Sequence, residues 1–344
     1  MKKSKFIVSA FNMYKGGSLS YFQRMAGLLH TLNNACVIVS KEMQSEFNFT
    51  SVIQIPFPLL FLNHIYRIFI EQIFVPAVGL FRSADCLIML GNFPCLFWTG
   101  SQRVLFHNTL YISNNSKKSI LFSLEVLYFK FLIKLKKPIL LVQTKYIKKL
   151  LEDFFDFPLE IFVVGIPRML VEQNLDTINH DSKVILFYPA DFHPHKNHRA
   201  LRPIIHSSEM QKLQIVLTIS KDEAAAAFTP IEFSEQLICV GKVDRHAVNE
   251  YYRKSSALLF LSQTESLGMP LIEACEHGLP IIAPDVDYVN SAISNFYKFD
   301  IDDIDSLKNA VNLFVNDYKH ASHRIACPKI LESQDKFLKS IIGI

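Results

Sequence analysis

Two glutamates, at positions 265 and 273, flank a Gly-Met-Pro turn in the stretch ESLGMPLIEACEHGLPIIAP. The apolar run before them predicts a buried strand, and the segment after Pro270 predicts a short helix, since proline suits a first helical turn. Gly268 allows close backbone approach, and the N–H groups at the start of the helix attract an anion such as a diphosphate. Carboxylates accept hydrogen bonds from ribose and sugar hydroxyls. The spacing therefore indicates a nucleotide-sugar site; taken as isolated residues, Glu273 would be a solvated helix position and Glu265 a capping carboxylate.

Short apolar runs that predict buried strands alternate with helical segments along the chain. Such continuous apolar strands are typical of a parallel sheet covered by helices on both faces. The runs lie at 5–11, 35–40, 84–91, 103–108 and 138–144 and, after a break at Gly165 and Pro167, at 183–190, 213–220, 237–243, 256–263 and 279–284. We therefore predict an α/β protein with two doubly wound domains, 1–165 and 166–325, and a C-terminal helix in 326–344 that packs back toward the first domain. Ligands of such sheets bind at the carboxyl ends of the strands, which here face a cleft between the domains.

The glutamate stretch resembles the E-x7-E segment of the family 4 glycosyltransferases of the GT-B fold (glycosyl transferases group 1). Besides both glutamates, the matching positions are Gly268, Pro270, Ala274, Gly278 and Pro280. The neighbouring segments agree in order and spacing, so that the similarity is firm over residues 183–285 and looser over 1–150. The resemblance implies two Rossmann-like domains that face a cleft. It also implies retaining transfer of a sugar from a nucleoside-diphosphate sugar, without a metal or other cofactor.

By this resemblance, the second domain binds the donor and the first binds the acceptor. Lys196, in the loop after the predicted strand 183–190, would pair with the diphosphate and stabilise the charge of the leaving group. Glu265 would bind hydroxyls of the donor sugar, and Glu273 would bind the ribose. Backbone contacts would come from Leu267, Gly268 and Met269.

One position departs from the family pattern. Many members have an arginine five residues before the lysine, and here that residue is Asp191. The candidates for a second cation are Arg199 and Lys242. The loop around the lysine also contains His193, His195 and His198. We interpret these histidines as part of an ordinary loop and not as zinc ligands, because no cysteine or carboxylate cluster accompanies them.

Two features of the first domain match the same resemblance. Gly16 and Gly17 follow the first predicted strand and correspond to the glycine loop that approaches the donor, although a Gly-Gly pair is also a simple tight turn. His107 ends the predicted strand 103–108, where the family often has a histidine that faces the reacting sugar. It is therefore a candidate catalytic residue with Glu265 and Lys196; taken alone, it would be a structural histidine.

Charge is distributed unevenly. Residues 1–150 carry 18 Lys and Arg against 5 Asp and Glu, whereas residues 151–344 carry 18 against 27. Lysines at 117–118, 130–137 and 145–149 alternate with apolar residues, which indicates either a solvated helix face or a surface that docks on anionic lipid. No nucleic-acid-binding motif accompanies them. A glycan or lipid-linked acceptor fits the resemblance best.

Targeting signals are weak. The apolar stretch near the N-terminus covers only about six residues, too few for a signal peptide. The longest apolar run, 64–81, is interrupted by Arg67 and Glu71. The six cysteines have no C-x-x-C spacing, which is typical of reduced thiols. We expect a cytoplasmic protein that associates with the inner face of the plasma membrane, and the oligomeric state stays open.

Other functions fit parts of the sequence. A nucleotide-sugar epimerase shares the fold, and a degenerate relative would bind nucleotide or a partner without turnover, for which Asp191 is the best support. Asp285 and Asp287 form a D-x-D after a predicted strand, the metal-binding motif of another glycosyltransferase fold, although a plain loop explains it more simply. The composition, rich in Phe with 29 and poor in Gly with 11, fits a bacterial polysaccharide or lipopolysaccharide enzyme.

Overall fold

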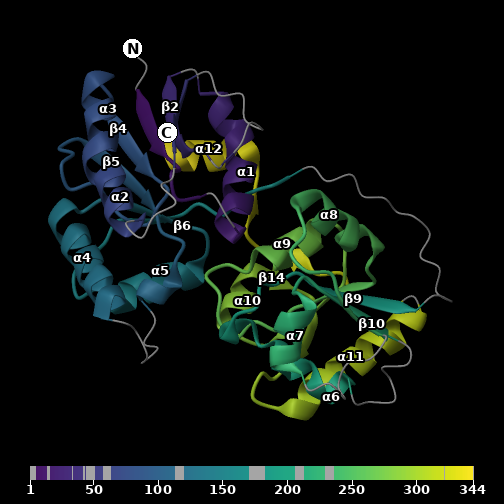
Figure 1. Ribbon diagram of the computed structural model, residues 1–344. Helices are drawn as coiled ribbons and strands as arrows, with labels where there is room; N and C mark the ends of the chain where they lie inside the picture. The colour runs from purple at the N-terminus through teal and green to yellow at the C-terminus, as the bar shows by residue number, and fades with distance from the viewer. Residues whose placement is uncertain are drawn as a thin grey trace. The chain divides into compact units, whose positions relative to one another are not determined.

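The chain divides into two compact units (Figure 1). Unit 1 comprises Met1–Arg168 and Ile330–Ile344, and unit 2 comprises Met169–Lys329. The sequence placed the corresponding boundaries after residues 165 and 325. The computed structural model describes residues 5–13, 16–32, 34–41, 43, 51–56, 63–112, 120–169, 183–205, 213–228, 236–320 and 322–343, with only the backbone described at 63–65, 121, 203 and 304. The predicted basic residues at 117–118 lie outside this set.

Unit 1 is built on a parallel sheet whose described strands follow the order β3-β2-β1-β4-β5-β6-β7. The strands are β1 (Phe6–Ser9), β2 (Ala35–Ser40), β3 (Val52–Ile55), β4 (Cys86–Met89), β5 (Ser101–Leu105), β6 (Ile139–Val142) and β7 (Ile161–Val163). Strands β1, β2 and β4 are buried along their whole length, as their apolar sequences predict for the centre of a covered sheet.

The helices of unit 1 connect these strands. They are α1 (Gly16–His30), α2 (Asn63–Phe69), the π-helix η1 (Ile70–Phe74), α3 (Val75–Phe81), the 3-10 helix η2 (Thr109–Tyr111), α4 (Ile120–Lys136) and α5 (Lys145–Phe154). Thr144 fixes the start of α5, because its side chain accepts a hydrogen bond from the N–H of Ile147 at 3.1 Å. The core of the unit is aromatic: Phe106 stacks on Phe129 with ring centroids 5.3 Å apart.

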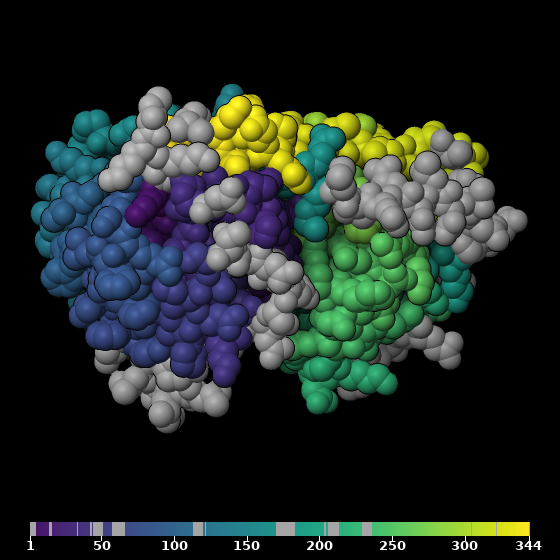
Figure 2. All heavy atoms as spheres, turned by 90° about the horizontal axis from the view of Figure 1, so that it is seen from above, coloured from purple at the N-terminus to yellow at the C-terminus, as the bar shows by residue number. Residues whose placement is uncertain are grey.

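The C-terminal residues belong to unit 1. Strand β17 (Leu331–Glu332) pairs in parallel with β8 (Ile166–Pro167), and helix α12 (Gln334–Ile342) packs on α1. Phe337 lies edge-on to Tyr21 of α1, with ring centroids 6.3 Å apart. In Figure 2, part of the yellow C-terminal surface borders the purple and blue residues of this unit.

Unit 2 contains a second parallel sheet, with the described strands in the order β11-β10-β9-β12-β13-β15. These strands are β9 (Val184–Tyr188), β10 (Leu213–Leu217), β11 (Leu237–Cys239), β12 (Ala257–Leu259), β13 (Ile281–Pro284) and β15 (Tyr297–Phe299); β14 (Ile293–Ser294) and β16 (Cys327–Pro328) form a separate antiparallel pair. The helices are η3 (Pro194–Lys196), η4 (His198–Leu201), α6 (Arg202–Ile205), α7 (Lys221–Ala227), α8 (Arg245–Lys254), α9 (Met269–Glu276), α10 (Asp287–Ala292) and α11 (Ile304–Lys319).

Within the two large sheets, the sequence analysis missed three strands, β3, β7 and β15; it also missed the short strands β8, β14, β16 and β17. Strands β3, β7 and β15 all lie at an edge of their sheet. Strands β3 and β7 are short and partly exposed, so they lack the continuous apolar run that marks a central strand.

Each sheet has a point at which the strand order reverses. In unit 1 the first strand, β1, lies between β2 and β4, and in unit 2 β9 lies between β10 and β12. Crevices for ligands form outside the carboxyl ends of the strands at such switch points. The residues that follow β1, β4, β9 and β12 are therefore the first places to look for function.

Candidate functional site

The switch point of unit 2 brings together two of the predicted site residues. Lys196 follows β9 and Glu265 follows β12, and these two strands pair in parallel. The ammonium of Lys196 donates a hydrogen bond to Oε1 of Glu265 and forms an ion pair with it. Both side chains are 18% exposed, so the pair is largely shielded but still reaches solvent. An anionic ligand that enters here meets a cation held in place by a carboxylate.

The loop that carries Lys196 is fixed by the strands beside it. The hydroxyl of Tyr188 donates a hydrogen bond to the carbonyl of Lys196 at 2.5 Å, and the N–H of Gln263 donates to the carbonyl of His195 at 2.8 Å. Asn197 ends the short η3 turn in a left-handed conformation with φ of 56°, which asparagine tolerates better than most residues. The lysine is therefore presented from a well-supported turn.

Helix α9 starts at the same edge of the sheet. Its N-cap is Gly268, with φ of 70°, a residue that has no side chain with which to cap this end. A Cβ added at Gly268 would lie 2.9 Å from Cδ1 of Leu271, so both the backbone conformation and the space require glycine. Because Glu265 pairs with Lys196, the alternative that it caps this helix is not seen. Leu267 and Met269 flank the turn and are both buried.

Glu273 lies one turn into α9, and its carboxylate contacts protein donors. Arg245 of α8 donates from Nη1 to Oε1 at 2.6 Å, and the hydroxyl of Tyr252 donates to Oε2 at 2.9 Å. The Glu273 side chain is only 5% exposed, whereas the Arg245 side chain is 36% exposed. The sequence did not single out Arg245, which lies 28 residues from its partner and has no motif of its own. The side chain that faces solvent in this pair is the arginine.

The two residues predicted as a second cation, Arg199 and Lys242, make another contact or face solvent. Arg199 is exposed and donates to the carbonyl of Ala226, near the C-terminal end of α7. Lys242 is exposed in the turn that follows Gly241. Asp191, the residue in place of the family arginine, is exposed after β9. Of the cations in the described part of this unit, Lys196 and Arg245 are the two that pair with the glutamates of the motif.

The three histidines around Lys196 pack against one another or against an aromatic ring. His193 and His195 stack with ring centroids 5.7 Å apart, and His198 is buried against Tyr188. Burial lowers the pKa of His198 to about 4, so its imidazole is neutral at physiological pH. Among the residues that the structure describes, no three His, Cys, Asp or Glu side chains are placed to hold a metal ion.

Asp285, the first aspartate of the D-x-D motif, accepts hydrogen bonds from other side chains. Lys298 Nζ donates to Asp285 Oδ1 at 2.8 Å, and Asn290 Nδ2 donates to the same oxygen at 2.7 Å. These hydrogen bonds lower the pKa of Asp285. Asp287 begins helix α10. The arrangement is that of a loop held against the next strand.

The predicted residues of unit 1 lie at the carboxyl ends of β1 and β5. Gly16 is exposed at the first position of α1 with φ of 57°, which favours glycine, and Gly17 follows it in the same turn. His107 follows β5, and its N–H donates to Oδ1 of Asn92 at 2.8 Å. Burial and the charge of Arg67 lower the pKa of the His107 imidazole to about 4. Its Nδ1 is buried and has no hydrogen-bond partner among the described residues.

Helix α4 carries part of the predicted basic and apolar surface, and the lysines at 145–149 lie on α5. The side chains of one face are exposed although they are apolar, with whole-residue exposures of 52–82%: Ile120, Leu124, Leu127, Phe131 and Leu135. The spacing of three, four and seven residues places them in one stripe. Lys130 and Lys134 of this helix are exposed, as is Lys137 immediately after its end. In the described residues, no helix has the length and apolar character needed to cross a bilayer.

Comparison with known proteins gives one family and a set of similar folds. The family model for Glycosyl transferases group 1 matches residues 172–326. No curated protein sequence matches the chain significantly. WaaG, a glycosyltransferase involved in lipopolysaccharide biosynthesis, is 13% identical with a TM-score of 0.71, over 98% of this chain and 100% of its own.

Two further solved structures are similar over nearly the whole chain. Sucrose-phosphate synthase from Thermosynechococcus elongatus is 14% identical with a TM-score of 0.69, over 99% of this chain and 94% of its own. HepE from Anabaena, in complex with UDP-glucose, is 11% identical with a TM-score of 0.70, over 99% of each chain. At such low identity, these likenesses establish the fold.

Proposed function

We propose that the chain is a retaining glycosyltransferase, because residues 172–326 match the model of the glycosyl transferases group 1 family and the chain has the GT-B fold. It moves a sugar from a nucleoside-diphosphate sugar to a glycan or lipid-linked acceptor. The setting that fits best is the synthesis of a bacterial surface polysaccharide or lipopolysaccharide, to which WaaG contributes.

The observation that carries this proposal is the pair of Lys196 and Glu265, the latter in the segment that leads into α9, whose N-cap is Gly268. A diphosphate at this edge of the sheet receives the Lys196 charge and the dipole of the helix. Lys196 then exchanges one carboxylate partner for the phosphate. Glu265, released from the lysine, accepts hydrogen bonds from the hydroxyls of the donor sugar.

The catalytic step needs charge stabilisation rather than a protein nucleophile. As the sugar–oxygen bond breaks, negative charge develops on the leaving diphosphate, and Lys196 with the helix N–H groups stabilises that charge. We expect no metal to be required. His107, neutral because of its low pKa, is suited to exchange hydrogen bonds with sugar hydroxyls.

The pair of Arg245 and Glu273 supplies the second contact with the donor. A carboxylate has about four lone-pair sites, and we propose that Glu273, held by Arg245 and Tyr252, also accepts a hydrogen bond from a ribose hydroxyl. Arg245 is the more exposed partner and takes the place of the cation missing at Asp191. The UDP-glucose complex of HepE makes UDP the first nucleotide to test.

The acceptor side of the proposal rests on helix α4. An exposed apolar stripe flanked by lysines is suited to lie in the interface of an anionic bilayer. A protein held there meets a lipid-linked acceptor at the membrane surface. We therefore propose a peripheral protein on the cytoplasmic face of the plasma membrane.

Donor binding and turnover are tested separately. UDP and GDP, added without metal and with EDTA, should raise the melting temperature, and a panel of nucleotide sugars with a bacterial lipid extract should show release of nucleoside diphosphate. K196A and E265A should each lower turnover by about 100-fold or more, which is the usual cost of removing one group that stabilises the transition state.

K254A is the matched control, because Lys254 is 71% exposed and its partner, Glu250, is a surface glutamate. Turnover in K196A and E265A equal to that of K254A would refute the assignment. Binding of UDP without turnover of any donor would favour the non-catalytic alternative.

A further inference from the structure

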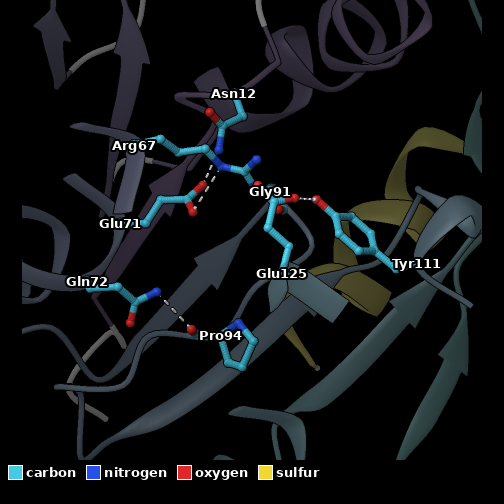
Figure 3. A network of polar contacts seen from close by, with 8 residues as sticks. All are labelled: Asn12, Arg67, Glu71, Gln72, Gly91, Pro94, Tyr111 and Glu125. Carbon is cyan, nitrogen blue, oxygen red and sulfur yellow. Dashed lines mark hydrogen bonds and ion pairs between the residues drawn. The ribbon is translucent and has the colours of Figure 1, made fainter. Parts of the chain in front are cut away.

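Unit 1 contains a pocket that the donor site does not use. It lies where α2 and η1 approach α4, and has an empty volume of about 330 Å³, including the space open to solvent. The lining side chains are Arg67, Glu71, Gln72, Phe93, Glu125 and Tyr128. Figure 3 shows the polar members from η1 and α4 with the partners that hold them.

The pocket lies beside the switch point of the first sheet. Asn12 follows β1, and Gly91 and Phe93 follow β4, the two strands between which the order reverses. Glu71 and Gln72 come from η1, a π-helical turn between two α-helices. Insertions of this kind are frequent at functional sites because they re-aim side chains. Both observations favour a ligand site here, and neither depends on the pocket's shape.

A buried network fixes the polar wall. Arg67 Nε donates to Glu71 Oε2 at 3.4 Å, its Nη2 donates to the carbonyl of Gly91 at 3.1 Å, and Asn12 donates to the other oxygen of Glu71. A Cβ at Gly91 would lie 2.6 Å from Glu71 Oε1, so glycine is needed for this network to close. The guanidinium is thus held in one orientation beside the pocket.

Aromatic rings form the other wall. Phe93 and Tyr128 stack with centroids 6.1 Å apart and an angle of 25°, and the guanidinium of Arg67 lies 5.2 Å from the centre of the Phe93 ring. Glu125 accepts a hydrogen bond from the hydroxyl of Tyr111 at 3.1 Å. Aromatic faces attract the weakly positive C–H groups of a sugar ring, while carboxylates bind its hydroxyls.

The charges on the walls limit which ligand fits. The positive charge of Arg67 faces Glu71, and Glu125 adds a second carboxylate, so no positive charge is left over for a phosphate or a carboxylate. A neutral or amine-bearing ring is favoured over an acidic one. The mouth is apolar: Ile68 lines it and is exposed, and Leu124 and Leu127 are exposed next to the two α4 residues of the wall.

We propose that this pocket binds a neutral or amino hexose, the terminal sugar of the acceptor. Its role in transfer rests on the proposed function, but binding of the sugar does not. The exposed apolar rim suits an acceptor whose sugar is attached to a lipid.

Saturation-transfer NMR with simple sugars tests the proposal. The probes are methyl α-D-glucopyranoside, methyl α-D-galactopyranoside and D-glucosamine, with D-glucuronic acid as the acidic counterpart. At least one of the first three should bind, and D-glucuronic acid should bind at least about tenfold more weakly. E125A and Y128L should each weaken binding about tenfold, the usual effect of losing one strong polar contact or a ring face. E152Q on α5 of the same unit is the control, since Glu152 is 52% exposed.

The same samples are tested for stabilisation by UDP, which separates this proposal from the proposed function. E125A and Y128L should keep the wild-type melting temperature shift with UDP, which also shows that they are folded. Binding of none of the neutral or amino sugars, or binding that both variants leave unchanged, would overturn the pocket assignment even where UDP still binds. Sugar binding without any effect of UDP would support the pocket and contradict the proposed function instead.

Discussion

Replacing Arg245 with alanine removes the cation that faces the buried carboxylate of Glu273. Loss of one partner of a fully buried ion pair costs about 3–5 kcal/mol, because the other charge stays without compensation. Here Arg245 is 36% exposed, and Tyr252 still donates to the carboxylate. Water that enters in place of the arginine screens the charge, so we expect a loss of about 2–3 kcal/mol in the free energy of unfolding of unit 2. For a unit of this size, that loss lowers the melting temperature by about 4–10 °C.

The chain provides a matched control on the same helix. Arg253 donates to Glu250 at 2.5 Å, but both side chains are 35% exposed. Because water surrounds both partners, R253A should leave the melting temperature unchanged within error. In the double variant R245A/E273Q no charge stays buried, and it should recover about half of the loss seen in R245A.

The assay is thermal unfolding with and without UDP. If Arg245 also contacts the diphosphate, R245A weakens UDP about tenfold while R253A has no effect. R245A as stable as R253A, or a double variant no more stable than R245A, would refute the account of the buried pair. Unchanged UDP affinity in a destabilised R245A would restrict Arg245 to a structural role.

Three further predictions follow from the described residues. His107 has a pKa of about 4 when folded against 6.5 for the free imidazole, so the unfolded chain takes up a proton first and stability falls as the pH drops from 6.5 to 4; H107N should reduce the loss of unfolding free energy between pH 7.5 and pH 5 by about 1–2 kcal/mol, and an unchanged loss would contradict the assignment. Gly268 has positive φ and a close contact with Leu271, so G268A should cost about 1–3 kcal/mol in thermal unfolding, and a neutral effect would show that the turn adapts. On α4, the L124S/L127S variant should lose most of its sedimentation with vesicles that contain phosphatidylglycerol, compared with L313S on α11, where Leu313 is also exposed; equal losses would argue against a membrane surface on α4.

The contact of Lys196 with Glu265 could be anticipated from the sequence for a topological reason. Each residue follows an apolar run that forms a central strand, and in a doubly wound sheet those two strands become neighbours on either side of the switch point. The topology of the sheet, and not closeness in the sequence, brings the two residues together. The contact of Glu273 with Arg245 has no such rule, because it joins two helices whose faces are set by packing. The edge strands β3, β7 and β15 escaped prediction for a related reason, since partial exposure shortens their apolar runs.

The pocket of unit 1 is a site that a hydropathy analysis of the sequence does not predict. The segment 64–81 is a long apolar run, and in the sequence Arg67 and Glu71 appear in it only as interruptions that argue against a membrane span. Their spacing of four residues is the spacing of side chains that meet on one helix face, and in the structure they form an ion pair. A buried pair of this kind is costly unless further donors and acceptors complete it, and Asn12 and the carbonyl of Gly91 do so. Opposite charges four residues apart within an apolar run are therefore a sign of an internal polar site, and they could have directed attention to this pocket from the sequence alone.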